Sequence, residues 1–282
     1  MTANKATGSA EHEIAPAEAA GLLGGLIEIV SRAAVVIMAK PYAEVARRAK
    51  ADRSPVTDAD VAAEAVILEG LARLLPGVSI VAEESVAHAP ARLTTSFVLV
   101  DPLDGTKEFL AGRDEFTVNL AIVTRGVPVA GIIAAPARGE LWHGTIGGGA
   151  ERFKLRWGDG PANAERTEIR TRSAPQRLIV TTSRSHLDEK TERFLARLPI
   201  ARHDRCGSSI KFCRLAQGDA DVYPRFSPTS EWDIAAGCAI VAAAGGAVTN
   251  PEGGALAFGR AEHAFVVPDF VAWGDPAKAG PR

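Results

Sequence analysis

The sequence is short of the residues that mark disulfide-rich, zinc-binding and nucleic-acid-binding proteins. Its 282 residues include three cysteines, which cannot all pair and whose spacing fits no zinc site: Cys206, Cys213 and Cys238. There is no excess of positive charge either, since 32 Lys and Arg are balanced by 34 Asp and Glu. From the cysteines we expect a reducing, cytoplasmic location. From the balanced charge we expect no nucleic-acid polymer as partner, so that any nucleotide bound is a small molecule.

Long uninterrupted apolar runs are also missing. The longest candidate, residues 22–38, is broken by Glu28, Ser31 and Arg32, which is typical of an amphipathic core helix and not of a membrane span. We expect no integral membrane segment, and a disordered tail over the small, polar residues 1–16. The sequence leaves open a peripheral association with the inner membrane and the oligomeric state, a homodimer included.

The pattern of apolar and turn residues divides the rest of the chain into two halves. Residues 17–147 predict an α+β domain with an extended stretch at 43–50 and a largely antiparallel sheet. Its helices are expected at 17–39 and 57–74 and its strands at 78–82, 97–100, 117–124, 127–134 and 139–145.

After a turn at residues 147–149, the C-terminal half, residues 148–282, alternates between strands and helices, which indicates an α/β domain. The expected elements are strands at 178–183 and 220–224 and helices at 187–198, 210–217 and 234–244. The fold class is therefore α/β, with an α+β N-terminal half and an α/β C-terminal half.

One apolar strand, near residues 97–100, ends in two carboxylates, Asp101 and Asp104, on either side of Pro102 and Leu103. Proline fixes its own φ, and Gly105 permits a close approach of backbone to a ligand. Both carboxylates and the Leu103 carbonyl can then converge on a hard cation such as Mg²⁺, which binds through one or two carboxylates plus substrate phosphate. Taken alone, the segment fits a surface turn equally well.

Two further acidic segments favour a metal site over a surface turn at residues 101–105. Glu83 and Glu84 follow the apolar residues 79–82, and Asp233 begins an alanine-rich helical segment. Glu83, Asp101, Asp104 and Asp233 in one cleft would repel one another and raise some of their own pKa values unless cations neutralised them. The sequence therefore predicts a metal-dependent site acting on a phosphate substrate, held by the N-terminal domain and completed by the C-terminal one.

Three segments together resemble the signatures of the inositol monophosphatase superfamily. Its members are Mg²⁺-dependent, lithium-sensitive phosphatases. They are residues 83–85 (Glu-Glu-Ser), 101–106 (Asp-Pro-Leu-Asp-Gly-Thr) and 232–233 (Trp-Asp). The resemblance runs over about residues 17–268. It implies a layered α-β-α-β-α sandwich of the lithium-sensitive sugar-phosphatase type, with the active site between the halves.

Three other segments resemble the CysQ branch of that superfamily, the 3'(2'),5'-bisphosphate nucleotidases. These are residues 183–186 (Ser-Arg-Ser-His), 207–213 (Gly-Ser-Ser-Ile-Lys-Phe-Cys) and 223–226 (Tyr-Pro-Arg-Phe). The resemblance implies removal of the 3'-phosphate of 3'-phosphoadenosine 5'-phosphate to give AMP, in sulfur assimilation or nucleotide recycling, with lithium as inhibitor. Two alternatives stay open: an inositol or sugar monophosphatase, and a non-catalytic sensor of phosphate ligands.

The resemblance also implies which residues hold two or three Mg²⁺ ions. We expect one ion at Glu83, Asp101 and the Leu103 carbonyl, where water is activated. A second is expected at Asp101, Asp104 and Asp233, where the leaving alkoxide is stabilised. Such paired ions clamp the attacking and leaving oxygens of an in-line displacement.

The family pattern places a proton acceptor in a Thr-x-x-Asp motif, here Thr57 and Asp60. Asp60 would take the proton of the attacking water together with Thr106, and Glu83 would assist from the metal. The same spacing also fits a helix-capping box, in which Asp60 has no catalytic role. We expect Asp58 to be a solvated surface charge and Glu84 to lie behind Glu83.

Substrate contacts are expected from backbone and side chains around these acids. Backbone N–H groups of Gly105 and Thr106 would face the scissile phosphate. Ser208 and Ser209 precede a helix and would bind an anion or a ribose; alternatively, they only cap that helix. The remaining candidates are Lys107, Arg184, His186, Lys211, Arg225 and Asp233. Arg225 is the strongest candidate, because a guanidinium suits a second phosphate and inositol monophosphatases typically have an acid upstream of Trp-Asp. Each Lys or Arg taken singly also fits a solvated surface charge, and His186 fits a structural role.

Overall fold

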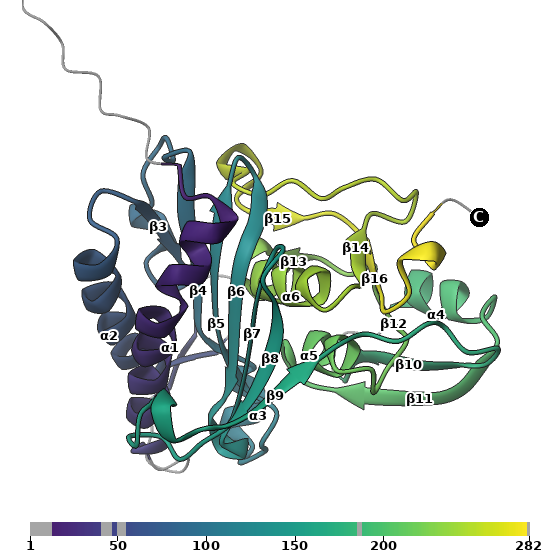
Figure 1. Ribbon diagram of the computed structural model, residues 1–282, viewed down its shortest axis with the longest axis horizontal. Coiled ribbons are helices and arrows are strands. Elements are labelled where there is room, and N and C mark those ends of the chain that lie inside the picture. Colours follow the sequence, from purple (N-terminus) through teal and green to yellow (C-terminus); the bar gives the residue numbers. More distant parts are fainter. Residues whose placement is uncertain (1–12, 41–46, 50–54, 185–187, 281–282) are drawn as a thin grey trace, which may run out of the picture.

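The computed structural model describes residues 13–40, 47–49, 55–184 and 188–280. Helices and sheets alternate in layers, which confirms the expected α-β-α-β-α sandwich (Figure 1). Helices α1 (Pro16–Met38) and α2 (Asp58–Leu74) cover the outer face of a seven-stranded sheet. The inner layer is formed by α5 (Ile210–Ala216) and α6 (Glu231–Ala243). A five-stranded sheet follows, with α4 (Glu189–Leu195) on its far face.

The seven-stranded sheet keeps nearly the order of the sequence. Its strands are β3 (Ser79–Ala82), β4 (Ser96–Asp104), β5 (Thr117–Thr124), β6 (Val127–Ala135), β7 (Glu140–Thr145), β8 (Gly149–Lys154) and β9 (Glu165–Ile169). Strand β3 runs parallel to β4, and each later pair is antiparallel. The sheet is therefore largely antiparallel, as the sequence predicts.

The domain boundary expected after residue 147 falls inside this sheet. Residues 147–149 do form a turn, with φ of +78° at Gly147 and +83° at Gly149, but it joins β7 to β8, so the sheet continues to Ile169. Strand β9 gives little signal in the sequence, because four of its five residues are exposed and polar. Hydrophobic periodicity, which identified β3 to β7 but not β8, cannot detect such an edge strand.

The five-stranded sheet has the order β11-β10-β12-β16-β14. Its strands are β10 (Leu178–Ser183), β11 (Ile200–Cys206), β12 (Val222–Arg225), β14 (Ala247–Thr249) and β16 (Phe270–Trp273). Strand β10 runs parallel to β11 and β12, whereas β16 is antiparallel to β12 and β14. The sequence analysis missed β11, which is polar and mostly exposed, and the short strands β14 and β16.

The described strands and α-helices also include two short two-stranded ribbons and one short helix. They are β1 (Arg47–Ala49) with β2 (Pro55–Thr57), β13 (Thr229–Ser230) with β15 (Val266–Val267), and α3 (Thr106–Leu110). Helix α3 starts immediately after β4, and β13 leads directly into α6. Both junctions supply residues to the site described below.

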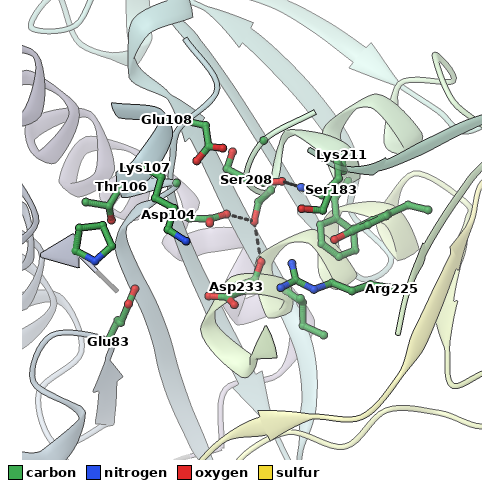
Figure 2. Close-up of a pocket in the computed structure, with 17 residues that line it drawn as sticks. Glu83, Asp104, Thr106, Lys107, Glu108, Ser183, Ser208, Lys211, Arg225 and Asp233 are labelled. Carbon is green, nitrogen blue, oxygen red and sulfur yellow. Dashed lines mark hydrogen bonds between the residues drawn. The ribbon is translucent and has the colours of Figure 1, made fainter. Parts of the chain in front are cut away.

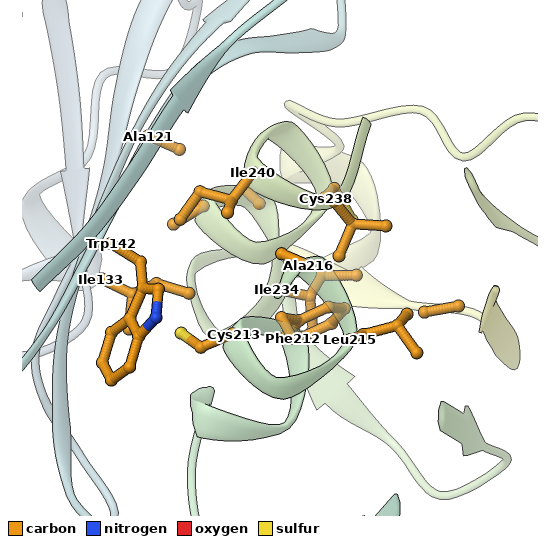
Figure 3. Close-up of a cluster of buried hydrophobic side chains, with 14 of the residues drawn as sticks. Ala121, Ile133, Trp142, Phe212, Cys213, Leu215, Ala216, Ile234, Cys238 and Ile240 are labelled. Carbon is orange, nitrogen blue, oxygen red and sulfur yellow. The ribbon is translucent and has the colours of Figure 1, made fainter. Parts of the chain in front are cut away.

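Helix α6 packs closely against the seven-stranded sheet because two strands present glycine to it. A Cβ atom at Gly131 of β6 would lie 2.3 Å from the Ala236 carbonyl oxygen, and one at Gly144 of β7 would lie 2.8 Å from the Ala243 Cβ. The core on this side joins the sheet to α5 and α6 through Trp142, Phe212, Ile234 and Ile240 (Figure 3). This contact brings the start of α6 next to the end of β4.

The amino end of the described chain is anchored to the sheet. Ile14 is fully buried, its N–H donates to Ser96 Oγ over 2.8 Å, and its carbonyl accepts from Thr124 Oγ1 over 2.8 Å. The disordered tail expected over residues 1–16 therefore does not extend to Ile14, and residues 1–12 lie outside the described part of the chain.

Helix α1 is, among the described residues, the one helix long and apolar enough to cross a membrane by length and composition. A helix in the core of a soluble protein passes the same test. Leu26, Val30 and Ile37 are fully buried, and α1 packs on α2 and β6. These contacts fit the amphipathic core helix that the sequence predicts.

Candidate active site

A cavity of about 200 Å³ lies between the two halves and collects most of the predicted site residues (Figure 2). One wall comes from the end of β3, the turn between β4 and α3, and α3 itself. The other comes from the loop before α5, the end of β12 and the first turn of α6. The predicted residues that line it are Glu83, Asp104, Gly105, Thr106, Lys107, Ser208, Ser209, Lys211, Arg225 and Asp233.

Asp101 lies in β4, three residues before the end of the strand, and does not itself line the cavity. Its side chain is 1 % exposed, and its Oδ1 accepts the N–H of Leu103 over 3.0 Å. The pairing of β4 with β5 is interrupted between Asp101 and Asp104, where Pro102 has no N–H to donate. Burial, followed by the charges of Glu83, Asp104 and Asp233, raises the pKa of Asp101 well above its ordinary value.

Asp104 shares a network with residues from β5, α5 and α6. Its Oδ2 lies 3.0 Å from Ser209 Oγ, which accepts from Asn119 Nδ2 over 2.9 Å and lies 2.7 Å from the Asp233 carbonyl oxygen. Burial and the neighbouring Asp233 raise the pKa of Asp104 to about 6, although Lys211 acts in the opposite direction. Ser209, which is expected to bind substrate, links these elements through its hydroxyl and is 2 % exposed.

Glu83 follows directly after β3, on the same wall of the cavity as Asp104. Its backbone N–H donates to the Val100 carbonyl over 3.1 Å, which continues the parallel pairing of β3 with β4 by one residue. In Figure 2 its carboxylate lies across the cavity from Arg225. The next residue, Glu84, is fixed by its N–H to Glu64 Oε2 of α2, 2.9 Å away. The sequence analysis missed Glu64, a buried acid on an otherwise ordinary helix.

Asp60 makes contacts that are compatible with both of the roles that the sequence left open. Its Oδ2 accepts the Thr57 N–H over 2.9 Å and the Thr57 hydroxyl over 2.5 Å, so it completes a capping box at the start of α2. Its Oδ1 accepts the Thr106 hydroxyl over 3.1 Å. Burial raises the pKa of Asp60, while the hydrogen bonds from Thr57 and Thr106 lower it; the net effect is upward.

Asp233 repeats this arrangement at the start of α6. Its Oδ2 accepts the Ser230 N–H over 3.0 Å and the Thr229 hydroxyl over 2.5 Å, again as the third helical residue of a capping box. The side chain also lines the cavity beside Arg225 (Figure 2). Two helix starts thus each bring one aspartate to the site.

Two of the cations that line the cavity, Arg225 and Lys211, lie on its C-terminal side. Arg225 ends β12, donates from Nη2 to the Pro228 carbonyl over 3.1 Å and extends toward Asp233 (Figure 2). Burial would lower the pKa of Arg225, but Tyr223, Asp233 and Asp104 outweigh it and raise that pKa. Lys211 is 2 % exposed and donates to the carbonyl oxygens of Cys206, over 3.4 Å, and Ser208.

Another expected substrate contact is not part of the cavity wall. Arg184 does not line it; its guanidinium pairs with Glu115, with Nη2 to Oε1 at 2.8 Å. The pairing with Glu115, an acid on another loop, is not evident from the local sequence around Arg184. His186 lies outside the described residues.

The residues of the acidic cluster fit a divalent cation by their chemistry. Within the described ranges no three Asp, Glu, His or Cys side chains already stand together as a preformed metal site. Asp101 is nevertheless buried, with three carboxylates raising its pKa. Every donor in the predicted set, including the Leu103 carbonyl, is an oxygen, which is the ligand type of Mg²⁺.

Comparisons with known proteins agree on one family. A model described as "Inositol monophosphatase family" matches residues 20–274. The chain is 42 % identical to the 3'(2'),5'-bisphosphate nucleotidase CysQ of Salmonella typhimurium, over 82 % of this chain and 89 % of that one. It is 41 % identical to the protein of the same name from Escherichia coli K12, over 78 % and 86 %.

Solved structures show the same relationship. The crystal structure of CysQ from Bacteroides thetaiotaomicron, described as a bacterial member of the inositol monophosphatase family, superposes with a TM-score of 0.70. The two chains are 32 % identical, and the match covers 88 % of this chain and 95 % of that one.

Proposed function

The chain belongs to the inositol monophosphatase family, and we propose that it is a Mg²⁺-dependent 3'(2'),5'-bisphosphate nucleotidase. The proposed reaction removes the 3'-phosphate of 3'-phosphoadenosine 5'-phosphate and yields AMP and phosphate. One observation supports this substrate most strongly: the cavity has Glu83 and Asp104 on one wall, and Arg225 and Lys211 on the other wall together with Asp233. A substrate with two phosphates can place one at each side.

The proposed metal ligands are Glu83, Asp101, the Leu103 carbonyl, Asp104 and Asp233, for two or three ions. When bound, Mg²⁺ would neutralise these carboxylates and lower the pKa of a coordinated water. The protein positions its ligands beforehand through fixed contacts. Asp101 accepts from Leu103, Asp104 is held at Ser209, and Asp233 is held by the cap of α6.

Proton transfer is assigned to Thr106 and Asp60. Because the Thr106 hydroxyl donates to Asp60 Oδ1, its oxygen can accept a proton from the attacking water while its own proton passes to Asp60. The pKa of Asp60 is raised by burial, which makes it a better acceptor than an exposed aspartate. The second oxygen of Asp60 stays in the helix cap and fixes the direction of the first.

Substrate recognition is assigned to both walls of the cavity. Backbone N–H groups of Gly105 and Thr106 face the scissile phosphate, and Lys107 adds positive charge. Arg225 binds the 5'-phosphate, and Ser208 contacts the nucleoside. A cytoplasmic location, a role in sulfur metabolism and inhibition by lithium are proposed from the family resemblance.

A kinetic panel tests this function. Phosphate release is measured with 3'-phosphoadenosine 5'-phosphate, inositol 1-phosphate and fructose 1,6-bisphosphate at fixed Mg²⁺. We expect the highest kcat/KM with the nucleotide. A preference for inositol 1-phosphate would make the protein an inositol monophosphatase, and no release from any of the three would favour a non-catalytic sensor.

A further inference from the structure

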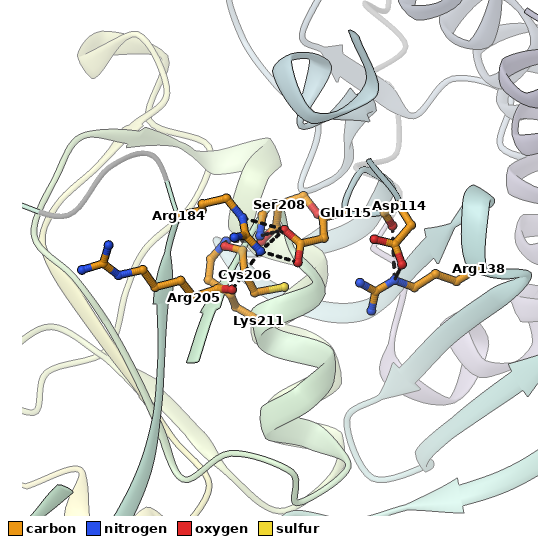
Figure 4. A network of polar contacts seen from close by, with 9 residues as sticks. Asp114, Glu115, Arg138, Arg184, Arg205, Cys206, Ser208 and Lys211 are labelled. Carbon is orange, nitrogen blue, oxygen red and sulfur yellow. Dashed lines mark hydrogen bonds and ion pairs between the residues drawn. The ribbon is translucent and has the colours of Figure 1, made fainter. Parts of the chain in front are cut away.

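A network of polar contacts near the cavity is centred on Glu115 (Figure 4). Glu115 lies between α3 and β5, in the N-terminal half. Its carboxylate accepts Arg184 Nε over 3.0 Å, Arg184 Nη2 over 2.8 Å, and the backbone N–H of Gly207 over 2.9 Å. Arg184 and Gly207 belong to the C-terminal half, so a single side chain joins the two walls of the cavity.

The backbone of Glu115 is also enclosed by two glycines. A Cβ atom at Gly207 would lie 2.8 Å from the Glu115 carbonyl oxygen, and one at Gly105 would lie 3.1 Å from the same atom. Gly105 also has a φ of +89°, which other residues rarely adopt. The turn that begins α3 and the loop that precedes α5 therefore both pack directly on Glu115.

The loop held in this way, residues 207–209, lines the cavity. Ser208 has a φ of +44°, an unfavourable conformation that the surrounding contacts must maintain. Its buried hydroxyl has no hydrogen-bond partner within the described part of the chain. An unpaired buried hydroxyl costs free energy, which the contacts around the loop must also offset.

We propose that Glu115 is a positioning residue that sets the affinity for the nucleoside part of the substrate by holding the loop of residues 207–209 in place. The inference rests on the proposed function. Glu115 does not line the cavity and need not touch the substrate. Although burial opposes ionisation, hydrogen bonds from Arg184 and Gly207 hold the pKa of Glu115 below its ordinary value, so the carboxylate remains charged for these contacts.

The kinetic test compares Glu115→Ala with Asp114→Ala. Asp114 is the adjacent acid and is paired with Arg138 over 3.0 Å, but its side chain is 61 % exposed and directed away from the loop. Glu115→Ala should raise KM for 3'-phosphoadenosine 5'-phosphate, and the inhibition constant of AMP, by about tenfold or more, with kcat changed less than about threefold. The inhibition constant of inorganic phosphate should not change. Asp114→Ala should behave as wild type.

A conservative variant separates the two contacts of the carboxylate. Glu115→Gln keeps an acceptor for the Gly207 N–H and should recover most of the lost affinity, whereas Arg184→Ala should give an intermediate rise in KM. Were Glu115→Ala to fail to fold, these two variants would replace it. Wild-type KM values in both would then overturn the proposal.

Amide hydrogen exchange at residues 207–209, measured without substrate, makes the test independent of the proposed function. Exchange should be faster in Glu115→Ala and unchanged in Asp114→Ala. Unchanged exchange in Glu115→Ala, a fall in kcat at constant KM, or an equal effect of Asp114→Ala would overturn the proposal. If the wild-type protein did not hydrolyse the nucleotide, the proposed function would fail and the exchange data alone would decide whether Glu115 holds the loop.

Discussion

At the scale of single residues, Asp60 and Asp233 each cap a helix and also reach the proposed active site. In both, Oδ2 caps a helix. The second oxygen of Asp60 takes the Thr106 hydroxyl, and the Asp233 side chain faces the cavity. A loss of stability in a variant therefore does not argue against a functional role, and only kinetics can establish one.

Asp60→Asn tests the assignment of proton transfer. The amide can still accept the Thr57 N–H, but it cannot take a proton from Thr106, so kcat should fall by about 10²-fold to 10⁴-fold while Mg²⁺ affinity stays nearly constant. Asp58→Asn, in the same first turn of α2, should keep kcat and lose only about 0.3–1 kcal/mol of helix stabilisation. Equal kinetic losses in both would assign Asp60 to capping alone.

Asp101→Asn and Asp233→Asn test the metal ligands. Each removes one negative charge from the acidic cluster without removing the side chain. Mg²⁺-supported turnover should be lost by more than the 10²-fold to 10⁴-fold typical of a general base, and the circular dichroism spectrum should be unchanged. Near-normal turnover of either variant at ordinary Mg²⁺ concentrations would rule out that residue as a ligand.

Arg225→Ala tests recognition of the second phosphate. A charged hydrogen bond contributes roughly 1.5–3 kcal/mol, so kcat/KM for 3'-phosphoadenosine 5'-phosphate should drop by about tenfold to a few hundredfold, mostly through KM. With 3'-AMP, which lacks the 5'-phosphate, the substitution should have little further effect. Equal penalties for both substrates would show that Arg225 does not bind the 5'-phosphate.

At the scale of elements, the position of α6 depends on the bare backbone of β6 and β7. The Cβ that any other residue would add at Gly131 meets the backbone of Ala236 at 2.3 Å, and backbone cannot move aside as a flexible side chain can. Because Asp233 stands at the first turn of α6, a shift of this helix would also displace one of the proposed metal ligands.

Gly131→Ala should therefore be both less stable and less active. We expect a loss of about 1–3 kcal/mol in the free energy of unfolding, and a fall in turnover at Mg²⁺ concentrations that saturate the wild type. Gly21→Ala in α1 is the matched control, because a Cβ there meets nothing within 4 Å and alanine is the better helix former by about 0.5–1 kcal/mol. Chemical denaturation of the two variants would give opposite signs; a Gly131→Ala protein as stable as wild type would contradict the packing argument.

At the scale of the whole molecule, the sequence predicts what local patterns encode. Apolar periodicity located α1, α2 and most of the antiparallel sheet, and the acidic segments located Glu83, Asp104 and Asp233, which the structure brings to one cavity. Polar strands such as β9 and β11 gave no periodic signal. The partners of site residues were missed for a different reason.

Glu64, Glu115 and Asn119 each make their key contact with a residue at least 20 positions away along the chain. Their neighbours in sequence show no pattern that distinguishes them from surface residues. The pairing of Arg184 with Glu115 is the clearest case, because the arginine alone had suggested a phosphate ligand. Such contacts depend on how the two halves meet, which the sequence does not state locally.

The acidic cluster joins the halves, so its protonation should affect the stability of the whole fold. In the folded protein without metal, burial and Asp233 raise the pKa of Asp104 to about 6. A raised acid pKa means that the folded state binds more protons than the unfolded state, so this group's contribution to stability falls as pH rises through the interval up to about 6. Under the proposed function Mg²⁺ would bind only the folded, ionised cluster, so saturating Mg²⁺ should reverse the trend.

Asp104→Asn isolates this effect from that of all other titrating groups. In EDTA, the unfolding midpoint of the variant minus that of wild type should rise between pH 5 and pH 8, because only the wild type acquires the buried charge. Each pKa unit corresponds to about 1.4 kcal/mol, and 1 kcal/mol to roughly 2–4 °C in a chain of this size. With saturating Mg²⁺ the wild type should become the more stable protein at pH 8, since the variant has lost a ligand. A difference in midpoint that does not change with pH in EDTA would show that burial and Asp233 do not raise the pKa of Asp104. A difference that Mg²⁺ does not change would show that Asp104 does not bind the ion.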